Sequence, residues 1–382
     1  MNNAKMNIIL DGRPLLDKEP TGVTFFTINF IKNLSQARPD FNFFIFTTGR
    51  KKPSITWFEN LPNVHLCHYQ IPNKLFNFLQ LFFHYPKIEN ILKKNYPEKN
   101  FDVLVLPNLN FFSTRLPYFA IFHDLSFEFL PNFYSLKSRL WHFLLNPKKT
   151  AQKAFKIFAV SENTKNDLQN LYKIDQTKIS VNFPNLKDFF KPEKNLPKEK
   201  NILFVGTIEK RKNILNLVKV FNDFSVSFPE HRLILIGKPG FGFVEIFNAI
   251  KNNEKIIYKN YLPENELTEY FQTAEFFVFP SFYEGFGLPI VEAMSYGLPI
   301  IASANSSMPE VISDAGILFN VFNNNQLLEA MKTLASNQNI RQYFATKSLT
   351  RYTEIQSSIN RQNTELLENL QKINDEVKLS SE

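Results

Sequence analysis

Cysteine is nearly absent and long apolar runs are absent from this sequence of 382 residues. The single cysteine, Cys67, excludes an internal disulfide and is typical of a protein in a reducing cytosol. No uncharged apolar run reaches about 18 residues, so the sequence predicts no membrane-spanning helix. The apolar residues 8–10 are too few for a signal peptide and lead directly into Asp11, so we expect no cleavable signal.

Metal-binding spacing and internal repeats are also absent. The six histidines show no spacing typical of a metal site. Nor does the sequence contain an internal repeat or a recognised nucleic-acid motif. These absences disfavour a histidine-ligated metal centre and a repeat architecture. A content of 44% hydrophobic and 21% charged residues describes an ordinary globular protein.

Positive charge is concentrated in the first half of the chain. Residues 1–185 contain 23 Lys and Arg against 13 Asp and Glu, a net charge of +10, whereas the whole chain has +8. This asymmetry suggests that the first half faces something anionic. An anionic membrane surface fits better than a nucleic acid, because basic and apolar residues alternate in 73–94 and 137–156. Ordinary core-facing helices with a solvated lysine face are the alternative.

Apolar runs separated by helical patterns indicate two α/β domains, since the chain is too long for one core. We predict residues 1–185 as the first domain and 201–340 as the second. The composition of 186–200 is typical of a linker, and helices that cross back to the first domain are expected over 341–375. The predicted strands are residues 7–10, 43–47, 64–67, 103–106, 118–122, 157–160, 179–181, 201–205, 232–236, 256–258, 277–279, 299–302 and 316–319.

Residues 277–302 hold the most informative pattern: a strand, a glycine-broken loop, a helix, a glycine stop and a second strand. The loop carries Glu284, then Gly285, Phe286 and Gly287, and Glu292 follows in the helix. Two glycines allow close backbone approach to a ligand, and the helix start favours a phosphate. The alternative is a glycine-rich turn with two solvated glutamates. Their spacing disfavours a retaining glycoside hydrolase, whose two carboxyl groups lie about 5 Å apart.

Further polar residues follow other predicted strands. Arg211 and Lys212 come after residues 201–205, where they either neutralise a phosphate group or form solvated surface. His123 follows residues 118–122, where it either binds a substrate hydroxyl or belongs to a structural His-Asp turn. Gly22 lies at another strand-to-helix turn. A helix is predicted there, because Thr21 can cap it and the apolar residues that follow have helical spacing. Ser161 is predicted to cap the helix that follows residues 157–160.

Several of these segments together resemble a known family. E-G-F-G-L-P-x-x-E at 284–292 resembles the signature of the retaining glycosyltransferases of family 4, which adopt the GT-B fold. Segments 121–135, 159–162, 206–213 and 304–311 look like the corresponding family segments. The resemblance therefore implies two facing doubly wound, Rossmann-like domains with a cleft between them. The runs VGTIEKRKN and EGFGLP look most like the mannosyltransferase-type group 1 members that use GDP-mannose.

The resemblance also implies roles for residues in the second half. Glu284 would contact the hydroxyls of the transferred sugar, and Glu292 would bind the ribose. The backbone from Gly285 through Phe286 and Gly287 to Leu288 would hold the sugar and the diphosphate.

Other roles are implied for the cations and for the first half. Arg211 and Lys212 would bind the diphosphate, His123 would lie near the reacting sugar, and the Gly22 loop would lie against the diphosphate. Two departures weaken these assignments: the Gly22 loop lacks a second glycine, and Thr207 stands where some relatives have arginine.

The predicted function is therefore retaining transfer of a hexose from a nucleotide-diphosphate sugar to a hydroxyl of a glycan or lipid-linked acceptor. Polysaccharide or lipopolysaccharide assembly in the cytoplasm, at the membrane periphery, is the expected setting. No D-x-D pair occurs, so neither a metal clamp nor a cofactor is expected. A noncatalytic sugar-nucleotide-binding protein and a basic nucleic-acid-binding protein are the alternatives.

Overall fold

The computed structural model of the protein describes residues 5–16, 22–53, 58–186 and 197–379, with the side chains of the last helix described up to residue 372. The chain forms two compact units. The first comprises Met1–Leu125, Lys137–Asn185 and Ile359–Glu382, and the second comprises Ser126–Leu136 and Leu186–Ser358.

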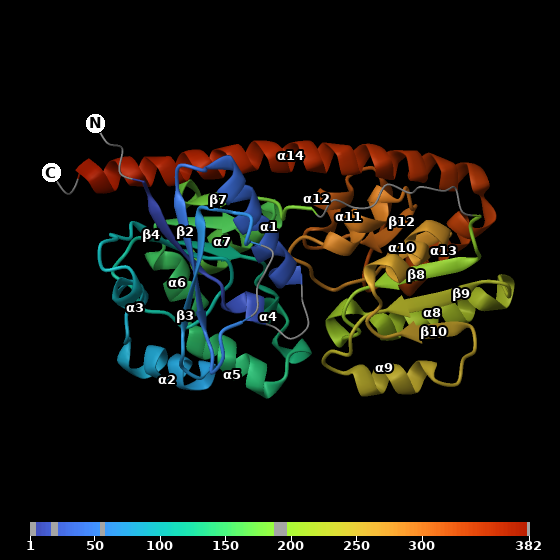
Figure 1. Cartoon of the computed structure of the whole chain (residues 1–382). Helices are drawn as coiled ribbons and strands as arrows, with labels where there is room; N and C mark the ends of the chain where they lie inside the picture. Colours follow the sequence, from blue (N-terminus) through green and yellow to red (C-terminus); the bar gives the residue numbers. More distant parts are fainter. Residues whose placement is uncertain (1–4, 17–21, 54–57, 187–196, 380–382) are drawn as a thin grey trace. The chain divides into compact units, whose positions relative to one another are not determined.

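The first unit is built on a parallel sheet of seven strands in the order β3-β2-β1-β4-β5-β6-β7. The strands are β1 Asn7–Asp11, β2 Asn42–Thr48, β3 Val64–Tyr69, β4 Val103–Leu106, β5 Tyr118–Phe122, β6 Lys156–Ala159 and β7 Ile179–Val181. Its helices are η1 Arg13–Leu16, α1 Gly22–Ala37, α2 Asn73–Phe83, α3 Ile88–Asn95, α5 Leu136–Leu145, α6 Pro147–Lys153, α7 Glu162–Tyr172 and η3 Gln176–Lys178 (Figure 1).

The second unit is built on a parallel sheet of six strands in the order β10-β9-β8-β11-β12-β13. The strands are β8 Asn201–Val205, β9 Arg232–Ile236, β10 Ile256–Lys259, β11 Phe276–Phe279, β12 Ile300–Ser303 and β13 Gly316–Phe319. Its helices are α4 Ser126–Phe129, η2 Pro131–Phe133, η4 Lys210–Lys212, α8 Ile214–Ser227, α9 Phe243–Ile250, α10 Glu264–Thr273, α11 Leu288–Ser295, α12 Met308–Ile312 and α13 Asn324–Ser336.

The predicted α/β class with doubly wound parallel sheets is confirmed for both units. All predicted strands occur, each within two residues of its predicted bounds. Helices cover both faces of such a sheet, so its central strands are buried. Strands β1, β4, β5 and β11 are buried at every position, including the polar end residues Asn7 and Asp11 of β1. Ser161 caps α7 as predicted, since its hydroxyl accepts the amide N–H of Thr164 at 3.0 Å.

The last helix, α14 Gln338–Leu379, contributes to both units, because the division falls at Ile359. In the first unit, its Gln362 accepts the backbone N–H of Phe183 at 2.6 Å, and Glu365 accepts the hydroxyl of Ser180 at 3.0 Å. Most of the predicted linker, residues 187–196, lies outside the described residues. So does Thr21, which was predicted to cap α1.

One grouping has no counterpart in the predicted domain ranges. Segment Ser126–Leu136 groups with the second unit, although both flanking segments belong to the first. Its rings of Phe129 and Phe133 stack on Tyr283 and Phe282 at centroid distances of 5.8 and 5.1 Å. No helix among the described residues has the length and apolar character needed to cross a bilayer.

Candidate functional site

The strand order of the second sheet reverses between β8 and β11, which are neighbours in the sheet. In open parallel sheets, ligands bind beyond the carboxyl ends of the strands at such a reversal. The chain leaves β8 through Gly206 and reaches η4 Lys210–Lys212. It leaves β11 through residues 280–287, which lead into α11. Two loops with predicted site residues therefore start side by side.

These two loops meet through three charged side chains. The Nζ of Lys212 lies 2.5 Å from Oε1 of Glu284, and Nη1 of Arg211 lies 3.4 Å from Oε2 of the same carboxylate. Arg211 also pairs with Glu209 at 2.8 Å and donates to the carbonyl of Tyr283 at 2.6 Å. The side chains of Lys212 and Glu284 are each only 9% exposed. Two predicted diphosphate ligands and the predicted sugar ligand thus form one buried ionic cluster.

The ionised form of Glu284 is stabilised in this cluster. Burial alone would raise the pKa of the carboxyl group, because desolvation penalises a charge. The positive charges of Lys212 and Arg211 outweigh this effect and hold the pKa of Glu284 below its ordinary value. Lys212 has a further electrostatic contact, since its Nζ lies 5.0 Å from the ring centroid of Phe279. At neutral pH Glu284 is therefore a hydrogen-bond acceptor only.

Backbone contacts hold the Glu284 loop in place. The N–H of Glu284 donates to the hydroxyl of Ser306 at 2.9 Å. The hydroxyl of Ser307 lies 3.0 Å from the carbonyl of Glu284 and 3.1 Å from that of Phe286. The N–H of Phe282 donates to the carbonyl of Arg211 at 2.9 Å. The residues before α12 and after β8 therefore both fix the loop, so its carboxylate is presented on a rigid support.

The start of α11 is the turn that was predicted to bind a phosphate group. Gly287 occupies the N-terminal cap position with φ +96° and ψ +48°, a left-handed conformation that favours glycine. Leu288 and Pro289 follow in the first turn. Pro289 lacks an N–H, and the Ile290 N–H donates to the carbonyl of Gly287 at 2.9 Å, so anion binding at this helix start stays a prediction. Glu292 lies one turn later and is partly buried.

The other two predicted site residues belong to the first unit. His123 follows β5, and its Nε2 lies 2.8 Å from the carbonyl oxygen of Pro107, which follows β4. Phe26, one turn after Gly22 in α1, contacts the imidazole edge-on at a centroid distance of 4.8 Å. Burial lowers the pKa of His123, although the Pro107 carbonyl and Asp124 act in the opposite direction. The imidazole is thus neutral at neutral pH, and its Nε2–H donates a hydrogen bond to the carbonyl oxygen of Pro107.

Asp11 and Arg13 brace the turn that follows β1. The Arg13 guanidinium donates to both carboxylate oxygens of Asp11, at 2.8 and 2.6 Å, and both side chains are buried. This bidentate pair indicates that the two residues stabilise the turn.

Some residues that hold the ionic cluster and its loop in place were not predicted from the sequence. Glu209 was not selected, although it lies two residues before Arg211 and pairs with it. Ser306 and Ser307 lie in a segment that resembles the family, yet no pattern indicated that their hydroxyls hold the Glu284 loop. The mutual pairing of Glu284 with both cations was also not predicted, because 72 residues separate Glu284 from Lys212.

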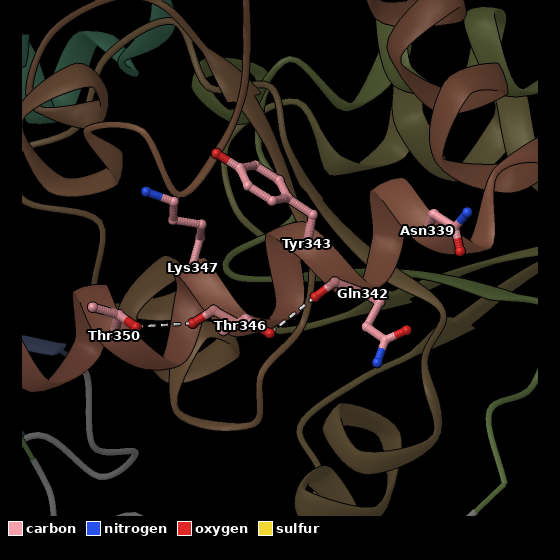
Figure 2. A pocket seen from close by; sticks show the side chains of 6 residues that line it. All are labelled: Asn339, Gln342, Tyr343, Thr346, Lys347 and Thr350. Atoms are coloured by element: carbon pink, nitrogen blue, oxygen red, sulfur yellow. Dashed lines mark hydrogen bonds between the residues drawn. The ribbon is translucent and has the colours of Figure 1, made fainter.

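A hollow of about 470 Å³ on α14 is a different surface feature. Figure 2 shows its lining side chains, which all project from this one helix: Asn339, Gln342, Tyr343, Thr346, Lys347 and Thr350. Within it, the hydroxyls of Thr346 and Thr350 donate to carbonyls one turn back, and Lys347 pairs with Asp314 at 2.6 Å. None of the predicted site residues lines it. Nor do the described residues contain a group of three or more His, Cys, Asp or Glu placed to hold a metal ion.

Family models match two parts of the chain. Residues 187–351 match the model described as glycosyl transferases group 1. Residues 20–183 match the model described as glycosyltransferase family 4. The two matches together take in most of both units.

One curated relative is the O-antigen chain mannosyltransferase B of Escherichia coli. The chain is 29% identical to it over 219 residues, which cover 52% of this chain and 55% of that protein. The chain thus spans about half the length of this curated relative.

Solved structures resemble the whole chain. Sucrose-phosphate synthase from Thermosynechococcus elongatus has a TM-score of 0.74 at 19% identity, with 96% of this chain and 99% of that chain covered. The Anabaena protein HepE, in complex with UDP and glucose, has a TM-score of 0.71 at 16% identity, with 96% and 100% covered. At these identities the likeness concerns the fold, and it confirms the predicted GT-B class.

Proposed function

The chain belongs to the group 1 glycosyltransferases of family 4, and from this membership we propose that it transfers a hexose from a nucleotide-diphosphate sugar to an acceptor hydroxyl. The acceptor is a glycan or a lipid-linked saccharide, and the anomeric configuration is retained. The observation that carries the proposal is the buried cluster of Arg211, Lys212 and Glu284 at the β8–β11 reversal.

The cluster supplies the charges that the reaction requires. When the bond between the sugar C1 and the diphosphate oxygen breaks, negative charge develops on the diphosphate and positive charge on the ring. Arg211 and Lys212 neutralise the diphosphate, in exchange for their contacts with Glu284. The released Glu284 carboxylate then accepts hydrogen bonds from the sugar hydroxyls. His123, neutral at neutral pH, supports a further hydroxyl, and the leaving phosphate takes the acceptor proton.

Mannose is the proposed hexose and GDP-mannose the proposed donor. The E. coli relative is an O-antigen chain mannosyltransferase, which supports mannose and an assembly of lipopolysaccharide type. The HepE structure contains UDP and glucose, so the test of donor specificity must include nucleotide sugars with other bases and sugars. Gly22, Gly285–Leu288 and Glu292 complete the proposed donor site.

Transfer without a metal ion is part of the proposal, because the cations take the place of a metal clamp on the diphosphate. Activity should then persist in EDTA. A loss in EDTA that Mg²⁺ or Mn²⁺ restores would contradict this part. The C1–H1 coupling constant of the isolated product distinguishes retention from inversion. A location on the inner face of the cell membrane is also proposed, through the basic first half of the chain.

The test is release of nucleotide from GDP-mannose, UDP-glucose and ADP-glucose by the purified chain. Lys212→Ala should lower the rate about 100-fold or more, as does removal of other groups that stabilise transition-state charge. Lys210→Ala is the matched control, because Lys210 is the adjacent cation but pairs with Glu245 at 2.6 Å. Circular dichroism shows whether the variants are folded. Equal rates for the two variants would refute the role of the cluster.

The noncatalytic alternative makes a different prediction. A sugar-nucleotide-binding protein would bind the donor with an affinity that Lys212→Ala weakens, yet it would release no nucleotide with any acceptor. Salt-dependent binding of DNA or RNA that nucleotide sugars leave unchanged would instead favour a nucleic-acid-binding protein.

A further inference from the structure

Helix α5 of the first unit exposes an unusual amount of apolar surface. None of its ten residues is buried. Leu136 and Phe143 are each 79% exposed, and Leu140 is 57% exposed. Trp141 anchors the helix, because its ring packs edge-on against Phe111 at a centroid distance of 4.7 Å. An ordinary surface helix buries one apolar face, so the exposed side chains of α5 indicate a partner outside the fold.

Helix α2 adds a second exposed apolar group. Its Phe76 and Gln80 are buried and hold the helix on the unit. Phe78, Phe82 and Phe83 project outward and are 50%, 63% and 64% exposed. The ring of Phe78 lies 4.8 Å from that of Phe82, so they form one aromatic cluster. Phenylalanines gathered in solvent in this way are typical of a contact surface rather than of scattered surface residues.

One hollow connects the two helices. A cavity of about 530 Å³ is lined by α2, by α5, by α6 and by residues 110–116. Lys87, Lys149 and Lys153 line it together with Gln80 and His84. Its apolar lining from the two helices is Leu81 of α2 and Leu144 and Leu145 of α5, so the hollow between them combines apolar side chains with positive charge. Figure 1 shows the two helices in the first unit.

The charge of this surface has one sign. Helices α2, α5 and α6 contain no aspartate or glutamate. They carry six exposed cations: Lys74, Lys137, Arg139, Lys148, Lys149 and Lys153. Apolar side chains among cations complement an anionic phospholipid surface, in which acyl chains lie below negative headgroups. We call the outward-facing residues of α2, α5 and α6 the basic apolar face.

We propose that the basic apolar face docks on an anionic phospholipid bilayer, with the side chains of α2 and α5 in the headgroup region and the lysines of α5 and α6 against the lipid phosphates. This inference deepens the membrane location proposed above, on which it rests, by naming the surface that makes contact. The cavity holds a lipid phosphate group on Lys149 and Lys153.

The test measures partition of the full chain onto vesicles of phosphatidylcholine, alone or mixed with phosphatidylglycerol. Binding is expected only to the mixed vesicles and should weaken with salt. The triple variant Lys137→Gln, Arg139→Gln, Lys148→Gln should bind at least about tenfold more weakly. The double variant Leu136→Ser, Phe143→Ser should lose about tenfold through the apolar contribution. These side chains are exposed, so the fold should be retained.

Matched controls lie in the second unit. Val226 and Phe322 are 81% and 83% exposed, and their serine variants should bind vesicles as the original chain does. The exposed Lys219 and Lys251, changed to glutamine, control for charge.

Either of two results would overturn the proposal. The first is undiminished vesicle binding by both the triple and the double variant, or no binding at all to the mixed vesicles. The second is a concentration-dependent dimer that Leu136→Ser, Phe143→Ser dissociates, because a second copy would then cover this face. Nucleotide release from the donor in vesicle-free buffer is measured in parallel. A chain that binds vesicles but turns over no donor would refute the proposed function and not this surface.

Discussion

Replacement of Lys212 by methionine tests the buried ionic cluster directly. Methionine keeps most of the side-chain volume and removes the charge, so Glu284 loses its partner at 2.5 Å. At an effective dielectric constant near 20, that pair has a Coulomb energy of about 7 kcal/mol, and the remaining Arg211 pair about 5 kcal/mol. Part of the first value is offset by the desolvation cost of Lys212 in the original chain.

We expect Lys212→Met to lower the free energy of unfolding of the second unit by about 3 kcal/mol, the lower end for breaking a buried pair. Arg211 still contacts the carboxylate at 3.4 Å, and this contact limits the loss. Hydrogen exchange of the β8 and β11 amides reports on this sheet by itself.

A double-mutant cycle separates the pair from packing effects. Glu284→Gln alone leaves Lys212 buried without its carboxylate and is also destabilising. The double variant Lys212→Met, Glu284→Gln removes both charges, and Arg211 keeps its partner Glu209 at 2.8 Å. We expect the double variant to recover about 2 kcal/mol relative to the sum of the single variants. Additivity within about 0.5 kcal/mol would refute the reasoning.

The free energy of unfolding, measured as the pH is lowered, tests the same cluster. The folded pKa of Glu284 is below its ordinary value, so the contribution of the carboxylate to stability is fully present above the unfolded pKa of about 4.3. It is lost as the pH falls through the folded pKa. The penalty of Lys212→Met should therefore shrink as the pH falls below the unfolded pKa and through the folded pKa, because a protonated carboxyl group no longer needs the ammonium group. A penalty that does not change from pH 7 to pH 3 would contradict this assignment.

Three other measurements test neighbouring features. Burial lowers the pKa of His123, so its ring protons should titrate in NMR below about pH 6.5. Protonation of this histidine should destabilise the fold as the pH falls below that value. A titration midpoint above pH 6.5 would contradict the burial of the ring. Burial raises the pKa of Cys67 to about 12, so the thiol should be inert to Ellman's reagent at pH 8 until the chain is unfolded. Fast reaction of the folded chain would contradict this prediction, because it would show that the thiol is accessible. Gly287→Ala should lower the free energy of unfolding by about 1–2 kcal/mol, because φ of Gly287 is +96°. Gly22→Ala should leave thermal unfolding nearly unchanged, because the added Cβ would lie in open space. Equal losses of stability would be evidence against backbone strain at Gly287.

Local patterns were sufficient to predict the elements. The strands are short apolar runs between turn residues, and such runs have few alternatives in a chain of alternating strands and helices. The cap at Ser161 could also be predicted, because it depends on the residue type at one position. Loops at the strand ends were marked as ligand-binding for the same reason.

Such local patterns could not predict the contacts between segments that are distant in the sequence. Nothing in the residues before Glu284 predicts that Phe129 and Phe133 stack there, since a ring contact depends on where the whole segment folds. The exposure of α5 could not be predicted either. Its basic and apolar residues fit a membrane-facing helix or a core-facing one, and only its position on the unit decides between the two.

The amino-acid sequence by itself determined the two parallel sheets, the turn chemistry and the family, because these depend on residue types at short spacing. Only the tertiary structure decided that Glu284 pairs with Lys212 and Arg211, which requires the reversal of strand order to place β8 beside β11. The physical reason is that a buried carboxylate stays ionised only where cations are within a few ångströms, and that proximity is a property of the folded chain.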